Sequence, residues 1–209
     1  MKRNIVRAVI LLGLVFLVVV GYEIGGRFET SIFSTLTPEI LPFVTEEEYS
    51  VYDVVIAGIR WSDKEPALIK HETCSHWRPE EDIEGIDNAM PDLQEETLAN
   101  FIAQIEEHGV LQKGHFDFPH AVFRVDDYSQ PQKIGKEEEL IFNWDLFRAT
   151  FPRGSLICVS RVGFNHEHTQ AFLYAESSLA PLSGRGFYVL LSYDDVAWKI
   201  DEIVLTWMS

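Results

Sequence analysis

Cysteine is scarce in this sequence, which has only Cys74 and Cys158 among its 209 residues. Two cysteines are too few for a scaffold held by several disulfides, and they lack the paired C-x-x-C spacing of a structural zinc site. One bridge between them is chemically open in an oxidising compartment, whereas Cys158 also fits a small apolar position in a strand. The cysteine content excludes a disulfide-stapled fold and leaves the state of this pair open.

Positive charge is also scarce. Lys and Arg number 17 against 33 Asp and Glu, which gives a formal net charge of -16 at pH 7. A chain this acidic repels phosphate backbones and has few cations with which to release counterions from nucleic acid. Nucleic acid is therefore excluded as a partner. Hydrophobic residues, in contrast, make up 46% of the chain, which is enough for a folded core.

The amino terminus contains a long uncharged run, from residue 8 to residue 20, preceded by Lys2, Arg3 and Arg7. Signal peptides and signal anchors share this pattern. No A-x-A cleavage site follows, which favours residues 1–27 as a retained transmembrane helix that binds the membrane. The positive-inside tendency then places the remaining chain outside the cytoplasm. The expected location is the cell membrane, single-pass, and the alternative is a secreted or periplasmic protein after signal cleavage.

Residues 28–44 contain glycine, serine, threonine and proline, as is typical of a juxtamembrane linker. Residues 45–209 are predicted to form a single α+β extracytoplasmic domain. Thr45 and Glu48 have the spacing of a capping box, and apolar residues at helical spacing follow. Asp92 and Glu95 have the same spacing before a second helical stripe, which ends at Gly109.

Strand patterns dominate the rest of the domain. Short strands are expected at 67–73 and 120–125, a polar turn-rich segment at 126–139, and a helix within 140–151. Alternating or apolar segments with short connections then follow at 155–164, 169–176, 186–193 and 198–207. Such connections predict a C-terminal antiparallel four-stranded β-meander with the two helices packed on one face.

The last third also carries a run of motifs, namely S-R-V-G-F-N, T-Q-A-F-L-Y, G-R-G-F-Y-V-L-L, W-K-I and L-T-W-M-S, in that order. In these motifs the sequence resembles a group of uncharacterised bacterial exported or membrane-anchored proteins. Members of that group often have a Gly- and Cys-rich turn before the G-x-G-[YF]-Y strand, whereas residues 178–183 contain no cysteine here. The resemblance implies an exported bacterial domain and brings no activity with it.

The first candidate site is His71-Glu72-Thr73-Cys74-Ser75-His76, where a strand ends in a loop. Zinc takes three or four nitrogen or sulfur ligands, and His71, Cys74 and His76 are the candidate metal ligands if the chain turns between them. The spacing matches no known zinc motif. Polar residues at the end of a strand, beside an acidic loop, are the favoured explanation of the same sequence.

The candidate ligand-binding residues are Arg161, His166 and His168. Arg161 is a cation within a strand of a very acidic domain, where it is expected either to pair with a buried or cross-strand acid or to bind an anion. His166 and His168 lie in a predicted turn and are suited either to loose metal chelation or to a hydrophilic hairpin tip.

These patterns favour a membrane-anchored extracytoplasmic domain that binds a protein or small ligand in the cell envelope without catalysis. The sequence contains no G-x-S-x-G elbow, so nucleophilic catalysis has no motif to support it. Two alternatives remain. One is a metal-assisted envelope enzyme that uses His71, Cys74 and His76, and the other is a structural or assembly factor.

Overall fold

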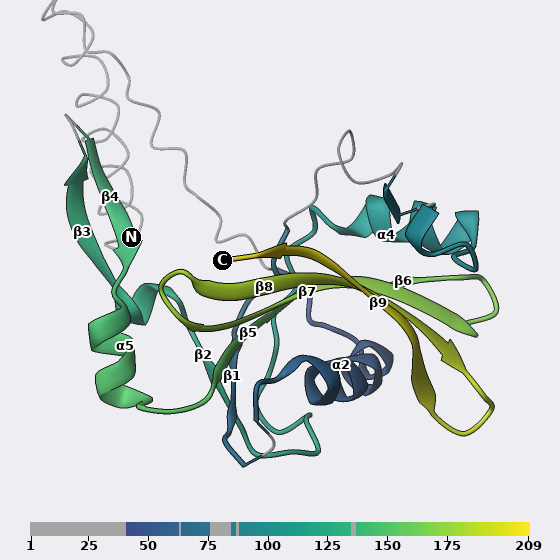
Figure 1. Cartoon of the computed structure of the whole chain (residues 1–209), viewed down its shortest axis with the longest axis horizontal. Helices are drawn as coiled ribbons and strands as arrows, with labels where there is room; N and C mark the ends of the chain where they lie inside the picture. The colour runs from purple at the N-terminus through teal and green to yellow at the C-terminus, as the bar shows by residue number, and fades with distance from the viewer. Residues whose placement is uncertain (1–40, 63, 76–84, 87, 135–136) are drawn as a thin grey trace, which may run out of the picture. The chain divides into compact units, whose positions relative to one another are not determined.

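A mixed β-sheet forms the centre of the structure, a computed structural model (Figure 1). The structure describes residues 41–209 except 63, 76–84, 87 and 135–136, so the predicted anchor and most of the predicted linker lie outside it. No helix within these residues is long and apolar enough to cross a membrane. Val44 is already buried, so the packed region begins just before Thr45.

The main sheet has seven strands, in the order β2-β1-β5-β7-β8-β9, with β6 paired to β7. The predicted antiparallel meander is confirmed in β5, β7, β8 and β9. The sheet is nevertheless larger than the predicted four strands, because β1 pairs in parallel with both β5 and β2. The strands are β1 (Ala67–Lys70), β2 (His120–Phe123), β5 (Ser155–Val159), β6 (Gly163–Phe164), β7 (Gln170–Ala180), β8 (Ser183–Tyr193) and β9 (Trp198–Met208).

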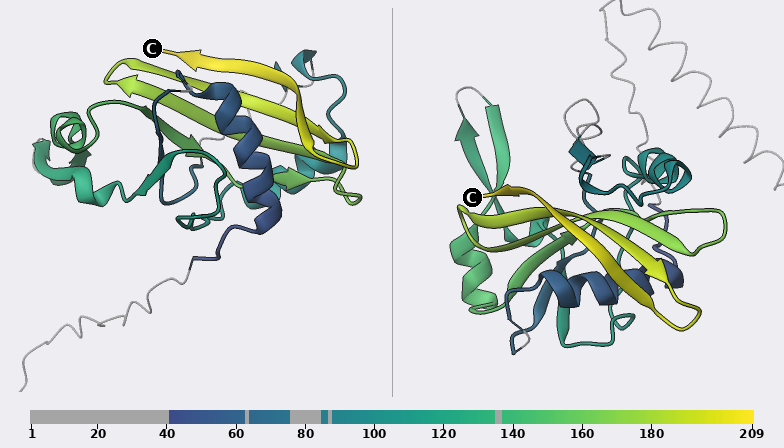
Figure 2. Two further views of the ribbon diagram at one scale, coloured as in Figure 1. Left: turned by 90° about the horizontal axis from the view of Figure 1, so that it is seen from below. Right: turned by 45° about the vertical axis from the view of Figure 1, so that its right-hand side comes forward.

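The two long helices, α2 (Glu46–Ile59) and α4 (Glu95–Gln104), cover opposite faces of this sheet (Figure 1). Figure 2 shows α2 crossing the strands when the sheet is seen from below. The prediction that both helices pack on one face is wrong. Strand β7 explains why: Leu173 belongs to the core under α2 while its neighbour Phe172 belongs to the core under α4. Strands buried on both faces are apolar at successive positions, so alternation does not reveal which face a helix covers.

The predicted strand at 155–164 is divided into β5 and β6 by an irregular segment around Ser160. Its hydroxyl donates to the Arg161 carbonyl oxygen at 2.7 Å and accepts from the Tyr174 amide at 2.9 Å. The side chains change sides across this segment: Cys158 lies in the core under α4, and Val162 lies in the core under α2. One sequence run therefore contributes to both cores.

The two helices begin differently. The capping box of α2 is confirmed, because the Glu48 amide donates to Thr45 Oγ1 and the Thr45 amide donates to Glu48 Oε2. The predicted box at Asp92 is wrong, since α4 begins at Glu95 and its N-cap Gln94 makes no side-chain capping bond. Gln170 of β7 supplies the missing acceptor, and its Oε1 lies 2.9 Å from the Gln94 amide nitrogen.

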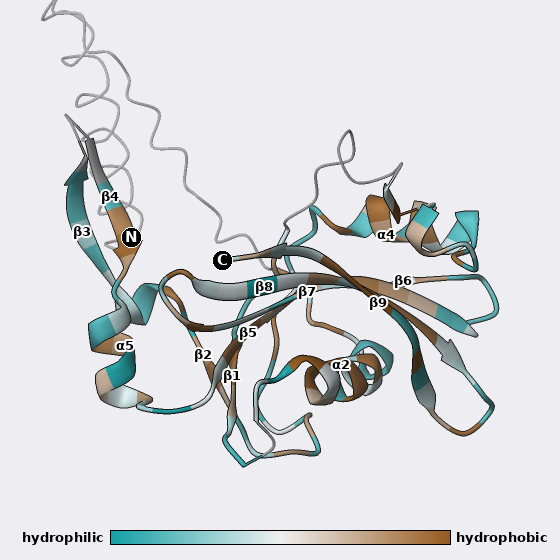
Figure 3. Cartoon of the chain, in the orientation of Figure 1, coloured by the Kyte–Doolittle hydropathy of each residue, from teal (hydrophilic) through white to brown (hydrophobic). Residues whose placement is uncertain are grey.

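The polar segment at 126–139, predicted to be a turn-rich loop, instead contains most of a second, two-stranded sheet. It comprises η1 (Asp126–Tyr128), β3 (Ser129–Ile134) and β4 (Glu137–Phe142), and α5 (Trp144–Thr150) follows. Figure 3 shows β3 as mainly hydrophilic, and a hydrophilic sequence of this kind is typical of a loop. The predicted helix at 140–151 is consequently shorter, because residues 140–142 belong to β4. Aromatic contacts of Phe147 with Tyr128 and Phe142 hold α5 against the base of this hairpin.

Candidate functional site

Arg161 is engaged in a buried ion pair with Glu48 of α2. Its Nε donates to Glu48 Oε1 at 2.8 Å, and its Nη2 donates to Glu48 Oε2 at 3.1 Å. Burial lowers the pKa of Arg161, but the hydrogen bonds and charge of Glu48 outweigh burial and the pKa is raised. The sequence leaves two roles open for Arg161, pairing with an acid or binding an anion, and the observed geometry is that of pairing with a buried acid.

His166 and His168 lie in the turn between β6 and β7. His168 Nδ1 is 2.8 Å from Glu47 Oε2, and its ring stacks on Phe164. Two open cavities flank this turn, one of about 430 Å³ and one of about 360 Å³. His168 lines both, whereas His166 lines only the smaller one. The predicted pair therefore meets at one surface, and Arg161 is not part of either lining.

The predicted metal ligands lie apart. His71 lines a cavity of about 60 Å³ at the end of β1, with Lys70, Glu72 and Arg124, and its Nδ1 is buried without a hydrogen-bond partner. Cys74 is instead buried in the core under α4, and His76 lies outside the described residues. Among the residues that the structure describes, no group of three or more His, Cys, Asp or Glu is arranged to hold a metal ion.

A row of polar side chains, which the sequence did not reveal, crosses the α4 face of the sheet. Cys158 of β5 is paired with Glu176 of β7, Glu176 with Gly186 of β8, and Gly186 with Trp207 of β9. Lys70 of β1 makes a side-chain hydrogen bond to Cys158. The charge of Cys158 raises the pKa of Lys70, and burial opposes this effect. We call these five residues the polar row.

Tyr174 links two members of this row, Glu176 and Trp207. Its hydroxyl donates to Glu176 Oε1 at 2.9 Å and accepts from Trp207 Nε1 at 2.7 Å. Gly186 makes that contact sterically feasible, because a Cβ there would lie 2.1 Å from Trp207 Nε1. Burial and the charge of Glu176 raise the pKa of Tyr174. The residues come from strands far apart in sequence, so no local motif identifies them.

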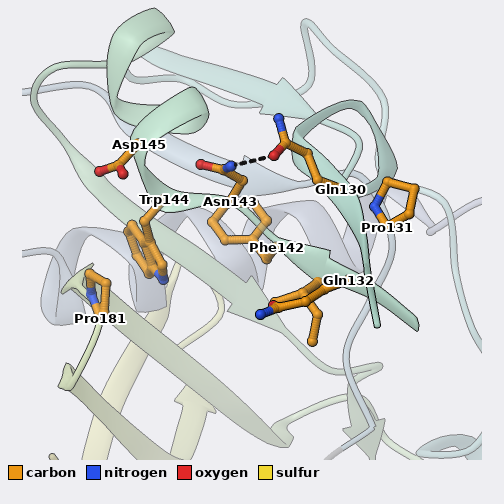
Figure 4. A pocket seen from close by; sticks show the side chains of 9 residues that line it. Gln130, Pro131, Gln132, Phe142, Asn143, Trp144, Asp145 and Pro181 are labelled. Atoms are coloured by element: carbon orange, nitrogen blue, oxygen red, sulfur yellow. Dashed lines mark hydrogen bonds between the residues drawn. The ribbon is translucent and has the colours of Figure 1, made fainter. Parts of the chain in front are cut away.

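A third open cavity, of about 410 Å³, lies between the β3–β4 hairpin, the start of α5 and the turn between β7 and β8 (Figure 4). We call it the hairpin cavity. Its lining combines amides, one carboxylate, aromatic rings and apolar side chains. The residues are Gln130, Pro131, Gln132, Ile141, Phe142, Asn143, Trp144, Asp145 and Pro181.

Two side chains hold the walls of the hairpin cavity in position. Asn143 caps α5, since its Oδ1 accepts from the Leu146 amide at 2.9 Å, and its Nδ2 donates to Gln130 Oε1 at 2.8 Å. Arg148 of α5 lies over the Trp144 ring and donates to the Leu179 carbonyl oxygen in β7. These bonds join the hairpin, the helix and the end of β7 around one opening.

The hairpin cavity offers hydrogen-bonding amides and one carboxylate, that of Asp145. Gln130, Gln132 and Asp145 are exposed, and the glutamine amides can both donate and accept. Phe142 and Trp144 pack edge to face and add apolar surface beside them. Among the described residues of its lining there is no Lys or Arg, so none of them can neutralise an anionic group.

The sequence indicated the helix that supplies Trp144 and Asp145, but not the hairpin that faces it. Comparisons with protein-family models, with curated proteins and with solved structures found no significant match to the chain.

Proposed function

We propose that this chain is a membrane-anchored extracytoplasmic protein whose domain binds a neutral polar ligand, a short saccharide, in the hairpin cavity without catalysis of its own. The volume of the hairpin cavity is the main support for ligand binding, because about 410 Å³ is in the range of small-molecule sites. The amino-terminal pattern described above supports the anchor and its orientation.

A saccharide fits this lining better than a charged ligand does. Sugar hydroxyls donate and accept at once, as do the amides of Gln130 and Gln132, and the Asp145 carboxylate accepts from further hydroxyls. The apolar faces of sugar rings can pack on Phe142 and Trp144. An anion meets no cation in the lining and a net charge of -16 on the whole chain, both of which disfavour its binding.

Saturation-transfer NMR on the full-length chain tests the ligand proposal, in a detergent that has no sugar headgroup. The probes are cellobiose, maltose and di-N-acetylchitobiose, each at millimolar concentration. We expect at least one of them to receive saturation. Gln132→Ala and Asp145→Ala each remove an exposed hydrogen-bonding group, so we expect each to weaken binding about tenfold, the loss of one hydrogen bond or slightly more.

Glu167→Ala and His168→Ala are the matched controls, since both side chains line a different cavity. They should leave saccharide binding unchanged. Binding that is lost in His168→Ala and kept in Gln132→Ala would move the site to the β6–β7 turn. If no probe receives saturation from the wild-type chain, the saccharide proposal fails.

The location has its own test. In bacterial cells the chain should remain in the membrane fraction after extraction with alkaline carbonate, and protease added to spheroplasts should digest residues 41–209. Release by carbonate would favour the alternative of a cleaved signal. Protection from the protease would contradict the proposed orientation.

The metal-assisted enzyme has less support, since His71 and Cys74, its two candidate ligands among the described residues, occupy different surroundings. The assembly factor predicts that exchanging residues 1–27 for an unrelated anchor impairs function.

A further inference from the structure

The two cysteines of the chain meet in the core under α4. The Cys74 amide donates to the Val159 carbonyl oxygen at 2.9 Å, which places Cys74 beside the end of β5. The side chains of Cys74 and Cys158 belong to the same buried cluster under α4. Both thiols are free in this structure. Residues 84 positions apart in the sequence therefore lie in one buried cluster beside β1 and β5.

The surroundings of the two thiols differ. Cys74 is 8% exposed and follows the end of β1, whereas Cys158 is 1% exposed and lies in the middle of the sheet. Lys70 follows Ile69, which is paired with Ile157, so its ammonium group lies on the strand beside Cys158 and is in place to stabilise a thiolate there. One thiol is thus the more accessible, and the other has a cation beside it.

We propose that Cys74 and Cys158 form a reversible disulfide, made by exchange with an external small-molecule or protein disulfide and assisted by Lys70. This is independent of the saccharide proposal, because neither cysteine lines the hairpin cavity. An extracytoplasmic location would supply such oxidants.

The exchange proceeds in two balanced steps. Burial raises the pKa of the Cys74 thiol, so Cys74 must first lose its proton; its thiolate then attacks one sulfur of the external disulfide R–S–S–R, which forms a Cys74–S–S–R bond and releases RS⁻. The Cys158 thiolate then attacks the Cys74 sulfur, forms the Cys74–Cys158 bond and releases a second RS⁻. The two thiol protons end on these leaving groups. Two electrons pass from the cysteine pair to R–S–S–R, and the products are the protein disulfide and two R–SH.

The experiment incubates the full-length chain in detergent with oxidised glutathione at pH 7, quenches it with acid, and labels free thiols with a maleimide under denaturing conditions. We expect two free thiols in the reduced chain and none after oxidation, with no dimer on a non-reducing gel and no retained glutathione. Dithiothreitol should restore both thiols. The oxidised chain should have a Tm higher by roughly 5–15 °C, because a bridge across a long loop restricts the unfolded chain.

Three variants assign the roles. Cys158→Ser should stop at one glutathione on Cys74, because the second step is lost, and Cys74→Ser should react far more slowly. Lys70→Gln should slow bridge formation by about 3–10-fold with the same final product. An unchanged rate in Lys70→Gln would remove Lys70 from the proposal. Two free thiols in the folded wild-type chain under excess oxidant, or a stable mixed disulfide on it, would overturn the bridge itself.

Discussion

Glu48 links the start of α2 to the irregular segment that follows β5. Its carboxylate accepts from the Thr45 amide, from Arg161 and from the Val162 amide, at distances of 3.0, 2.8 and 3.3 Å. The Glu48 side chain is 2% exposed, and that of Arg161 is 10% exposed. At this burial each charge depends on the other, since neither is compensated by water.

We therefore expect Glu48→Gln to lower the free energy of unfolding by about 3 kcal/mol, because it leaves the Arg161 charge buried without its counter-charge. Glu47→Gln is the matched control. Glu47 is the preceding residue and pairs with His168 at an exposed position, so this change should remain within about 0.5 kcal/mol. Urea unfolding of both variants measures the difference, and equal values would contradict a buried ion pair.

At the scale of single residues, the sequence predicts local contacts and misses distant ones. The Thr45–Glu48 box could be read directly, because its two residues are three apart. Glu48 could not be chosen as the partner of Arg161 among 33 acids, since the two are 113 residues apart. The saccharide proposal depends on similarly distant residues, because Pro181 and Gln130 meet only after folding.

Helix α4 depends on one side chain of β7 for its first turn. Gln170 Oε1 accepts from the Gln94 amide and from the Thr97 hydroxyl, and its Nε2 donates to the Asp92 carbonyl oxygen at 2.9 Å. Amides in the first turn of a helix have no partner within the helix, so the acceptor must come from elsewhere. The sheet provides it here.

Gln170→Ala should therefore destabilise the protein by about 2 kcal/mol, since it leaves buried donors without an acceptor. Hydrogen exchange should accelerate at the first turn of α4 while α2 remains protected. Gln104→Ala is the control on the same helix. It removes only the bond from Gln104 to Asn100, worth at most about 0.5 kcal/mol. Faster exchange in α2 as well would instead indicate global destabilisation.

At the scale of elements, the antiparallel strands at the C-terminal end were predictable, because their turns are short and their side chains regular. The parallel pairing of β1 was not predictable, since four residues carry no signal for a partner that follows much later in the chain. The β3–β4 hairpin was missed for a different reason. Strand β3 is mainly polar, so the hairpin lacks the apolar alternation by which strands are recognised.

For the whole molecule, several buried groups hold protons more tightly in the folded state than in the unfolded chain. Burial raises the pKa of Tyr52 and that of Tyr174, and the charge of Cys158 raises the pKa of Lys70. Unfolded tyrosine and lysine lose their protons near pH 10. Above that pH the unfolded state binds fewer protons than the folded state, so the free energy of unfolding must fall as pH rises.

We expect urea unfolding between pH 8 and pH 11 to show a stable plateau followed by a decline from about pH 10. Each of the three groups contributes a slope of up to about 1.4 kcal/mol per pH unit. Tyr174→Phe removes one proton site and should make the decline shallower, although its loss of two hydrogen bonds lowers the plateau. A flat profile to pH 11, or an unchanged slope in this variant, would contradict the assignment.

The polar row also affects the register in which the strands of the main sheet pair. Adjacent side chains of a strand point to opposite faces, so a slip of one residue in β7 would move Glu176 from the side of Cys158 to the apolar side of Ile157 and Val189. A slip in β9 would remove Trp207 from the gap above Gly186, where the absence of a side chain leaves room for the indole. The polar row thus specifies the register of the strands. A misaligned sheet could still bury its apolar side chains, but it would lose these contacts and be less stable.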